Sequence, residues 1–267
     1  MSDECGRLIT VLRSLPSAAL RVSFLRAYLG DASRPEAART FDRMCHDGAR
    51  GGDKEALFAV ALLLSSLAVD PVLDRLGEHA ARGRLEDLGR LLRRGAIPSQ
   101  PPPSRVPEYR ADRELTIGER RSMARRPDRR LFEKLLADPN PLVIERLLEN
   151  PRLTEDDVVR LAARRPAPIE AQLVLARTPW MCRRRVRLTL LQNPGTPAAV
   201  TVPLVALCTR TELGMLSKSF ESSRIVREIA LELLLIREEV DRPPDAPGDQ
   251  SRPPTSASLL LPRRPRS

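Results

Sequence analysis

Hydrophobic residues recur along most of this chain at helical spacing, in short runs separated by proline, asparagine and glycine. The clearest example is residues 135–161, whose pattern predicts a helix, a stop, a second helix, a second stop and a third helix. In the second helix the apolar positions share one face: Val143, Ile144, Leu147 and Leu148. Asn140 supplies an N-cap, and Pro141 suits the first helical position, where a missing N–H costs no hydrogen bond.

The boundaries of these helices are also encoded locally. Asn150-Pro151 ends the second helix, because the residue before a proline is pushed out of the α region. Thr154 and Asp157 form a variant capping box for the third. Helices of two to three turns are marginal alone in water, so they require neighbours that cover their apolar faces. The pattern therefore predicts an array of stacked short helices.

Two phrases of the sequence recur, which extends this array. Residues 153–166 echo residues 115–127, and residues 177–194 echo residues 136–151. The spacing of about 40 residues is typical of helical repeats. A further unit is predicted to start at Thr196-Pro197, so the array is expected to cover residues 115–240.

Residues 1–95 predict a separate helical domain. Its most apolar segment, residues 56–69, follows an Asp53 cap and is apolar nearly all round, which predicts the buried central helix of this half. Pro16 is expected to open the second helix, and Asp70-Pro71 a later one. Gly95 is expected to close the last helix at the C′ position.

A capping box of Ser33 and Glu36 marks another predicted helix start in the same half. Residues 96–114 contain five prolines and predict a proline-rich linker. A spacer is favoured there over a docking peptide for an SH3-like domain, since no further PxxP-plus-arginine context supports docking. Residues 241–267 are rich in proline, serine and arginine without periodicity, which predicts a disordered basic tail.

Composition narrows the fold class and the partner. Hydrophobic residues make up 42% of the 267 residues but aromatic residues only 3%, which favours an all-α fold over a β-sandwich. The net charge is +10, and nearly all cations are arginine. Arginine binds carboxylate and phosphate through paired hydrogen bonds, so an acidic partner is indicated. The competing explanation is that arginine is simply the favoured cation of a GC-rich genome.

The remaining residues give little sign of chemistry. The four cysteines are far apart and have no histidine cluster nearby, so neither a disulfide framework nor a metal site is expected. No apolar run approaches the roughly 20 residues of a membrane span, and the N-terminus lacks a signal-peptide layout, which predicts a cytoplasmic protein. The adjacent carboxylates Asp156 and Asp157 are interpreted as helix-capping groups rather than as an acid–base pair. No nucleotide-binding loop, nucleophile motif or metalloprotease motif occurs.

The phrase LADPNPLVIERLLENPRLT, residues 136–154, resembles bacterial leucine-rich-repeat-variant and HEAT-like repeats. The resemblance covers about residues 115–240 and rests mainly on Asn150-Pro151 and Asn193-Pro194. It implies a right-handed α-solenoid that binds macromolecules. Some leucine-rich-repeat-variant proteins carry an N-terminal cysteine cluster for an iron–sulfur centre, but Cys5 and Cys45 are isolated here, so no cofactor is carried over.

Arginines of the array are the candidate binding residues. Equivalent positions of a solenoid stack into a stripe, and such a stripe could contact an acidic protein or follow a phosphate backbone. The candidate set consists of Arg121, Arg125, Arg160, Arg164, Trp180, Arg183, Arg184 and Arg187. The alternatives are a solvated face balanced by acids such as Glu149 and Asp156, and, for Trp180, a hydrophobic plug between repeats.

These features together predict a non-enzymatic helical-repeat scaffold. It would bind a macromolecular partner, an acidic protein in the first instance, through an arginine-rich face. The alternative is salt-sensitive binding of duplex nucleic acid through the same arginines, as in HEAT-like DNA glycosylases. Single-strand recognition is disfavoured because aromatic residues that stack on bases are nearly absent.

Overall fold

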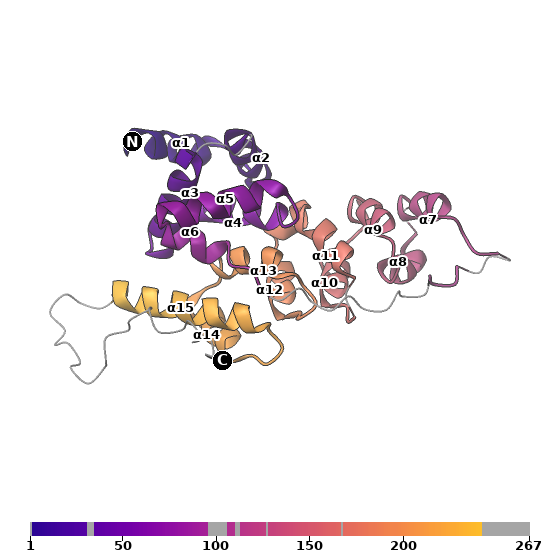
Figure 1. Ribbon diagram of the computed structural model, residues 1–267. Helices are drawn as coiled ribbons and strands as arrows, with labels where there is room; N and C mark the ends of the chain where they lie inside the picture. Colours follow the sequence, from indigo (N-terminus) through magenta and orange to yellow (C-terminus); the bar gives the residue numbers. More distant parts are fainter. Residues whose placement is uncertain are drawn as a thin grey trace, which may run out of the picture.

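The structure, a computed structural model, is all-α, as the sequence predicts. The part of the chain that it describes comprises residues 2–30, 35–95, 106–109, 113–126, 128–166 and 168–241. These residues form 15 α-helices and one short 3₁₀-helix, and none of them lies in a β-strand (Figure 1). None of the described helices is long and apolar enough to cross a membrane.

The helices fall into two groups along the chain. The first group is α1 (Ser2–Ser14), α2 (Ala18–Leu29), α3 (Pro35–Ala49), α4 (Lys54–Ser66), α5 (Pro71–Gly83) and α6 (Glu86–Leu91). The second group is α7 (Ile117–Ala124), α8 (Arg129–Leu136), α9 (Pro141–Leu148), α10 (Glu155–Ala163), α11 (Ile169–Ala176), η1 (Pro179–Cys182), α12 (Arg184–Gln192), α13 (Ala198–Val205), α14 (Arg210–Lys218) and α15 (Arg224–Asp241).

Several predicted caps are confirmed atom by atom. Asp53 accepts a hydrogen bond from the Ala56 N–H at 2.9 Å, and Asp70 accepts one from the Val72 N–H at 3.0 Å. The Asn140 side chain caps α9 in the same way, at 3.0 Å from the Leu142 nitrogen. Each satisfies a donor that the first helical turn leaves unpaired. The predicted capping box at Thr154 forms, and two others form at Thr116 and Thr209; their third-position acids are Asp157, Glu119 and Glu212.

Two predicted helix boundaries are wrong. Pro16 does not open α2; Ser17 is its N-cap, and its side chain accepts from the Leu20 N–H. Gly95 does not cap α6, which ends at Leu91 with Leu92 as its C-cap. A Cβ at Gly95 would lie 2.9 Å from the Ala198 Cβ, so this glycine allows the chain to pass close to α13.

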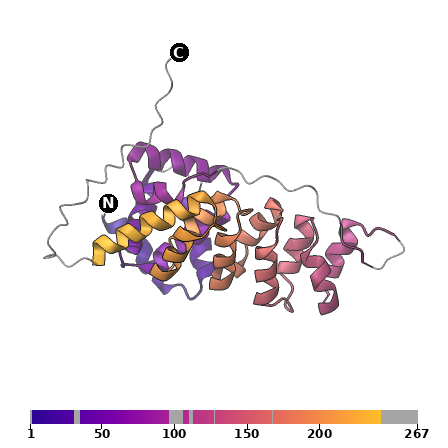
Figure 2. The same cartoon turned by 90° about the horizontal axis from the view of Figure 1, so that it is seen from below.

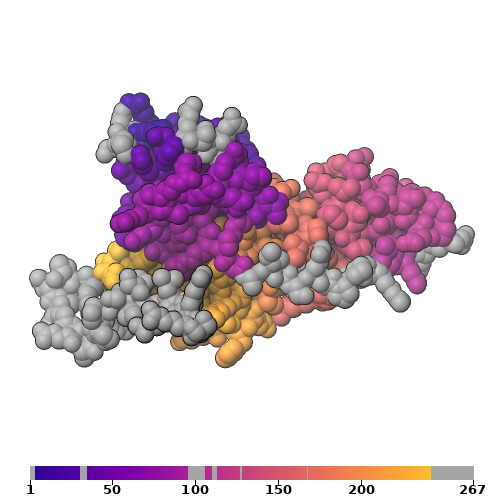
Figure 3. Space-filling view, in the orientation of Figure 1, coloured from indigo at the N-terminus to yellow at the C-terminus, as the bar shows by residue number. Residues whose placement is uncertain are grey.

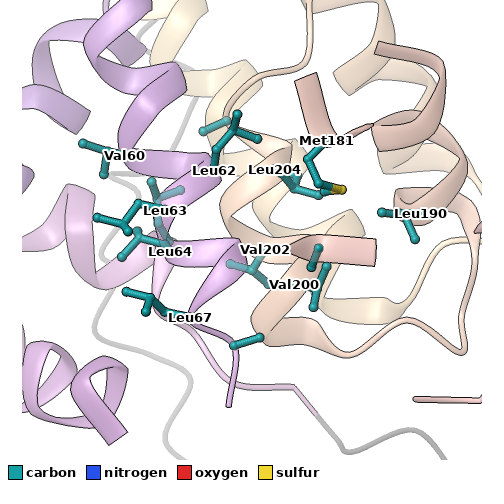
Figure 4. Packing of buried hydrophobic residues seen from close by; sticks show 14 of the residues in the cluster. Val60, Leu62, Leu63, Leu64, Leu67, Met181, Leu190, Val200, Val202 and Leu204 are labelled. Carbon is teal, nitrogen blue, oxygen red and sulfur yellow. The ribbon is translucent and has the colours of Figure 1, made fainter. Parts of the chain in front are cut away.

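Helix α4 is the centre of the whole molecule rather than of its N-terminal half alone. Nearly every residue from Ala56 to Ser66 is buried, as the sequence predicts. Helices α1, α2 and α3 cover part of its surface, and α13 covers another part. Figure 4 shows the leucines of α4 facing Val200, Val202 and Leu204 of α13. The second group of helices therefore completes the core of the first.

The helices from α7 to α12 stand side by side in a row (Figure 2). Short loops join them, and successive helices run in opposite directions. Helix α9 packs on α7 and on α11, and α12 packs on α10 and on α13. The row begins with α7 at one end of the molecule and meets α4 through α11 and α13 at the other.

Parts of the predicted linker and all but one residue of the predicted tail lie outside the described residues. So does Ser33, and with it the proposed Ser33–Glu36 capping box. Of the linker, residues 106–109 and 113–114 are described, and the Tyr109 hydroxyl donates to Asp138 Oδ2 at 2.9 Å. The division of the chain at this linker stays a prediction.

Candidate functional site

The two asparagines of the recurring phrase lie at opposite edges of the row. Asn150 donates from Nδ2 to the carbonyls of Ala124 and Arg126, at 2.7 and 2.9 Å, which joins the ends of α7 and α9. Asn193 donates in the same way to the carbonyls of Ala162 and Arg164, at 2.7 and 3.0 Å, which joins the ends of α10 and α12. We call these the Asn150 edge and the Asn193 edge.

Helix α8 connects the two edges and shows which loops lie at each. At its start, Arg129 Nη1 donates to the Arg152 carbonyl, 3.2 Å away in the loop that follows Asn150. At its end, the carbonyls of Leu136 and Asp138 accept from Arg164 Nη1, at 3.3 and 3.0 Å. Because the helices alternate in direction, the N-termini of α8, α10, α12 and α14 all lie at the Asn150 edge.

The predicted stripe of Arg121, Arg125, Arg160 and Arg164 is not one row of side chains. Arg125 follows α7 at the Asn150 edge, whereas Arg164 follows α10 at the Asn193 edge, so the length of α8 separates them. That helix has 8 residues, which corresponds to roughly 12 Å. Each unit has an odd number of helices, and successive helices run in opposite directions. Equivalent helices of neighbouring units therefore run in opposite directions, so their arginines lie at opposite edges.

Arg164 and Arg160 each have partners in the fold. Arg164 is half-buried, and burial lowers the pKa of its guanidinium, which donates to carbonyls at the end of α8. Arg160 is exposed, and its Nη1 lies 3.7 Å from Glu133 Oε1 of α8. Arg121 and Arg125 form no ion pair with any carboxylate that the structure describes, and Arg125 is exposed.

The dense arginine cluster at the start of α12 is largely engaged with its surroundings. Arg184 forms an ion pair with Glu212 of α14, and Arg185 forms one with Asp156 of α10 at 2.7 Å. Arg187 donates to the carbonyls of Met181 and Cys182, both at 2.9 Å. Its guanidinium carbon also lies 5.0 Å from the ring centroid of Phe58 in α4, which links α12 to the N-terminal group.

Arg183 and Trp180 complete the candidate set. Arg183 is exposed and has no carboxylate partner among the described residues. Trp180 is half-buried against the hydrophobic core, and its Nε1 donates to the Leu148 carbonyl at the end of α9, 3.0 Å away. This position agrees with the interpretation of Trp180 as a plug between units, because its ring packs inward and its one polar atom is satisfied.

Ion pairs cross from helix to helix along the Asn150 edge. Arg129 at the start of α8 bonds Asp157 of α10, with one of the two contacts at 3.1 Å. The neighbouring Asp156 pairs with α12, α12 pairs with Glu212 of α14, and Arg210 of α14 pairs with Asp241 of α15 at 2.8 Å. Basic and acidic helix starts therefore alternate along this edge.

The acidic helix starts are suited to their place. Burial alone would raise the pKa of the Asp157 carboxyl, but hydrogen bonds from Arg129 and Thr154 outweigh burial and lower it. In Glu212 burial is likewise outweighed by hydrogen bonds from Thr209 and by Arg184, so its pKa is also lowered. Asp157 also completes its capping box through Thr154, as predicted, which supports a structural role for the Asp156-Asp157 pair over acid–base chemistry.

The outer end of the Asn150 edge contains arginines that take no part in these ion pairs. Arg125, Arg126, Arg130 and Arg152 are all exposed, and none forms an ion pair with a described carboxylate. Their loops are held together by the hydrogen bonds from Asn150 to the Arg126 carbonyl and from Arg129 to the Arg152 carbonyl. We call this group the outer arginine patch. It lies on the part of the molecule that projects away from the N-terminal helices (Figure 3).

Only Arg125 of this patch belongs to the set predicted from sequence. Arg130 and Arg152 were missed because they do not recur at equivalent positions of the two phrases. Arg126 does recur, as Arg165, but only the first arginine of each Arg-Arg-Pro ending was included in the candidate set. The signal that could have found them is the balance of charge: the acidic start of α10 faces the basic start of α8, and residues 125–130 contain four arginines against one acid, Asp128.

The described residues contain no candidate metal-binding cluster, and their most buried thiols are not activated. None of them forms a group of three or more histidine, cysteine, aspartate or glutamate side chains that could hold a metal ion. Burial raises the pKa of the Cys208 thiol to about 12 and also raises that of Cys45, which keeps both as unreactive thiols. The His46 ring lies 2.8 Å from Asp87 and belongs to an ion network between α3 and α6, which includes Arg50 and Arg90.

No family model, no curated protein and no solved structure matches this chain.

Proposed function

We propose that this chain is a non-enzymatic helical-repeat scaffold that binds an acidic protein partner through the outer arginine patch. The observation that carries the proposal is the contrast along the Asn150 edge. Most arginines near the centre of the molecule are paired with carboxylates or bonded to carbonyls, with Arg177 and Arg183 as exceptions, whereas four exposed arginines at the outer end form no ion pair with a described carboxylate.

The repeat character of the second helical group is part of the same proposal. Asn150 and Asn193 are 43 residues apart. Asn150 follows α9 and donates two hydrogen bonds from Nδ2 to carbonyls at the end of α7, whereas Asn193 follows α12 and donates two to carbonyls at the end of α10. Each also accepts, through Oδ1, the N–H of the residue two positions later, at 2.9 and 3.0 Å. Identical hydrogen bonds at matched positions support a HEAT-like or leucine-rich-repeat-variant α-solenoid.

Charge supports an acidic partner over a neutral one. Residues 113–241 contain 23 arginines and lysines against 18 aspartates and glutamates, and four of these cations form the outer arginine patch. Each guanidinium group can bind a carboxylate through paired hydrogen bonds, so arginines on neighbouring loops suit a partner with several carboxylates. The same excess is modest for a duplex binder, which neutralises a continuous row of phosphates. A cytoplasmic location agrees with the sequence and remains part of the proposal.

The test is a binding measurement on the full chain with three labelled probes: a glutamate- and aspartate-rich peptide, duplex DNA and duplex RNA. Fluorescence anisotropy at low and physiological salt gives an affinity for each. We expect the acidic peptide to bind most tightly at physiological salt. Tighter binding of DNA or RNA, with a steep salt dependence, would instead establish the nucleic-acid alternative.

Charge reversal localises the site. Changing Arg125, Arg126, Arg130 and Arg152 to Glu should abolish peptide binding, while leaving the helical circular dichroism spectrum unchanged. A matched control reverses four exposed cations elsewhere, which are Arg39, Arg43, Arg75 and Lys218. Equal losses in both variants, or no binding of any probe to the unmodified chain at low salt, would refute the proposal.

A further inference from the structure

A cavity of about 420 Å³ lies where the two helical groups meet. One wall is the corner between α3 and α4, and the opposite wall is the loop between α13 and α14 together with the end of α15. Its volume falls within the range of roughly 300–1,000 Å³ that is usual for small-molecule sites. Because each group supplies one wall, the cavity exists only in the packed molecule.

The inner part of the cavity is apolar. Leu57 is buried and Phe58 is half-buried on α4, and Leu207 is half-buried on the facing loop. Val240 near the end of α15 adds an exposed apolar side chain, with 47% of its surface accessible. Apolar surface that remains open to water in a concave site favours a ligand with an apolar body.

Positive charge surrounds this apolar part. Lys54, Arg50, Arg210 and Arg237 all line the cavity, against a single carboxylate, Asp241. Three of these cations already have hydrogen-bond or ion-pair partners in the fold. Arg50 pairs with Asp87, Arg210 pairs with Asp241, and Arg237 donates to the carbonyls of Ala206 and Cys208.

Lys54 is the exception among these four cations. It is exposed and forms no ion pair with a described carboxylate. It is also the first residue of α4, directly after the Asp53 cap. The Asp53 carboxylate already caps the start of this helix, so it is the unpaired charge of Lys54 that favours an anion in the cavity.

We propose that the cavity binds a small amphipathic anion, with one carboxylate or phosphate group at Lys54 and an apolar body against Leu57, Phe58 and Leu207. Arg210 and Arg237 strengthen the positive field around the head group while they keep their structural partners. This site is separate from the outer arginine patch and does not depend on the function proposed for it.

The test compares four probes by isothermal titration calorimetry on the full chain, all below their micelle concentrations. Decanoate carries both features of the ligand; decanol keeps the apolar body, decylammonium reverses the charge and acetate keeps only the head group. We expect saturable binding of one decanoate per chain. Decanol should bind about five- to tenfold more weakly, which is the range for an ion pair partly shielded from water.

Variants place the binding in this cavity. Lys54→Gln should weaken decanoate about three- to tenfold and leave decanol unchanged, because only the head group loses a partner. Lys218→Gln is the matched control, since Lys218 is an exposed lysine at the end of α14 that does not line the cavity. Val240→Trp fills the mouth from an exposed position and should abolish binding of both probes, with the circular dichroism spectrum unchanged.

Three results would overturn the proposal. The first is no saturable binding of decanoate. The second is equal affinity for decanoate and decanol, which would mean that the anion is not recognised. The third is an equal effect of Lys54→Gln and Lys218→Gln, which would place the charge effect outside the cavity.

Discussion

The centre of this molecule and its outer end are stabilised by different interactions. At the centre, α4 and α13 meet through leucines and valines that are almost completely buried (Figure 4). At the outer end, α7, α8 and α9 also bury apolar side chains such as Phe132 and Ile144, but buried polar groups join them as well. The comparison indicates that the outer end of the row relies in part on hydrogen bonds that fix the ends of its helices.

The polar group around Asp138 is the clearest case at the outer end. The Asp138 side chain is fully buried, and both of its oxygens lie 2.6 Å from Arg120 Nη1. It also accepts from the Tyr109 hydroxyl and from the Asn140 N–H, both at 2.9 Å. One carboxylate therefore joins the linker, α7 and the start of α9.

Asp138→Ala should produce the largest loss of stability. It leaves the Arg120 guanidinium buried without its partner, which costs about 3–5 kcal/mol. Amide exchange should accelerate in α7, α8 and α9 but not in α4, if the outer end opens separately. The pair replacement of Arg120→Met with Asp138→Leu should restore part of the loss, because it removes both charges. Equal acceleration in α4 would show that the two regions unfold as one unit.

Leu63→Ala tests the centre in the same terms. Leu63 is fully buried in α4, so the substitution should lower the free energy of unfolding by about 2–5 kcal/mol through lost burial and a cavity. Chemical denaturation gives this value. Leu142→Ala on α9 is the control, because Leu142 is 45% exposed and its truncation should cost much less. Similar losses for the two leucines would contradict the picture of a core centred on α4.

The two asparagines test how much the hydrogen bonds at helix ends stabilise different parts of the row. Asn150→Ala and Asn193→Ala each remove two hydrogen bonds to carbonyls at a helix end, and each should cost about 1–3 kcal/mol. Asn193 lies closer to the α4–α13 centre than Asn150. If the hydrogen bonds are equivalent, denaturation should give losses of similar size. A negligible loss at either position would show that water replaces the asparagine there.

Asp157 provides a smaller effect that depends on pH. Its folded pKa is lowered below the ordinary value of 3.8, so its stabilising contribution is present above that pH and is lost as the pH falls through the folded pKa. Asp157→Asn should therefore lower stability by about 1 kcal/mol at pH 7. It should also flatten the decline of stability below about pH 4. Asp156→Asn, at an exposed pair, should change stability little at either pH.

The sequence predicted the features that depend on neighbouring residues. The caps at Asp53, Asp70, Asn140 and Thr154 are local, because a side chain bonds a backbone N–H two or three positions away. The apolar stripes of the helices are also local, so the all-α class and the buried character of α4 followed directly from them.

Features that depend on distant partners could not be predicted from the sequence. An apolar helix does not reveal which helix will cover it, so α4 was assigned to the N-terminal half alone. Arginine is similarly ambiguous: Arg164 binds backbone carbonyls, whereas Arg125 remains exposed, although the two stand at equivalent places in their phrases. Gly95 was assigned to a helix end because its close contact with α13 lies more than 100 residues further along the chain.

The contact between α4 and α13 also has a consequence for synthesis of the protein. About 130 residues separate the two helices, so α4 emerges from the ribosome long before the surface that covers it. Until α13 has been made, α4 presents leucines to water, in a state prone to aggregation. We therefore expect the nascent chain to need chaperones while only its N-terminal half has been made. A chain that ends before residue 198 should keep this need, because it lacks the helix that covers α4.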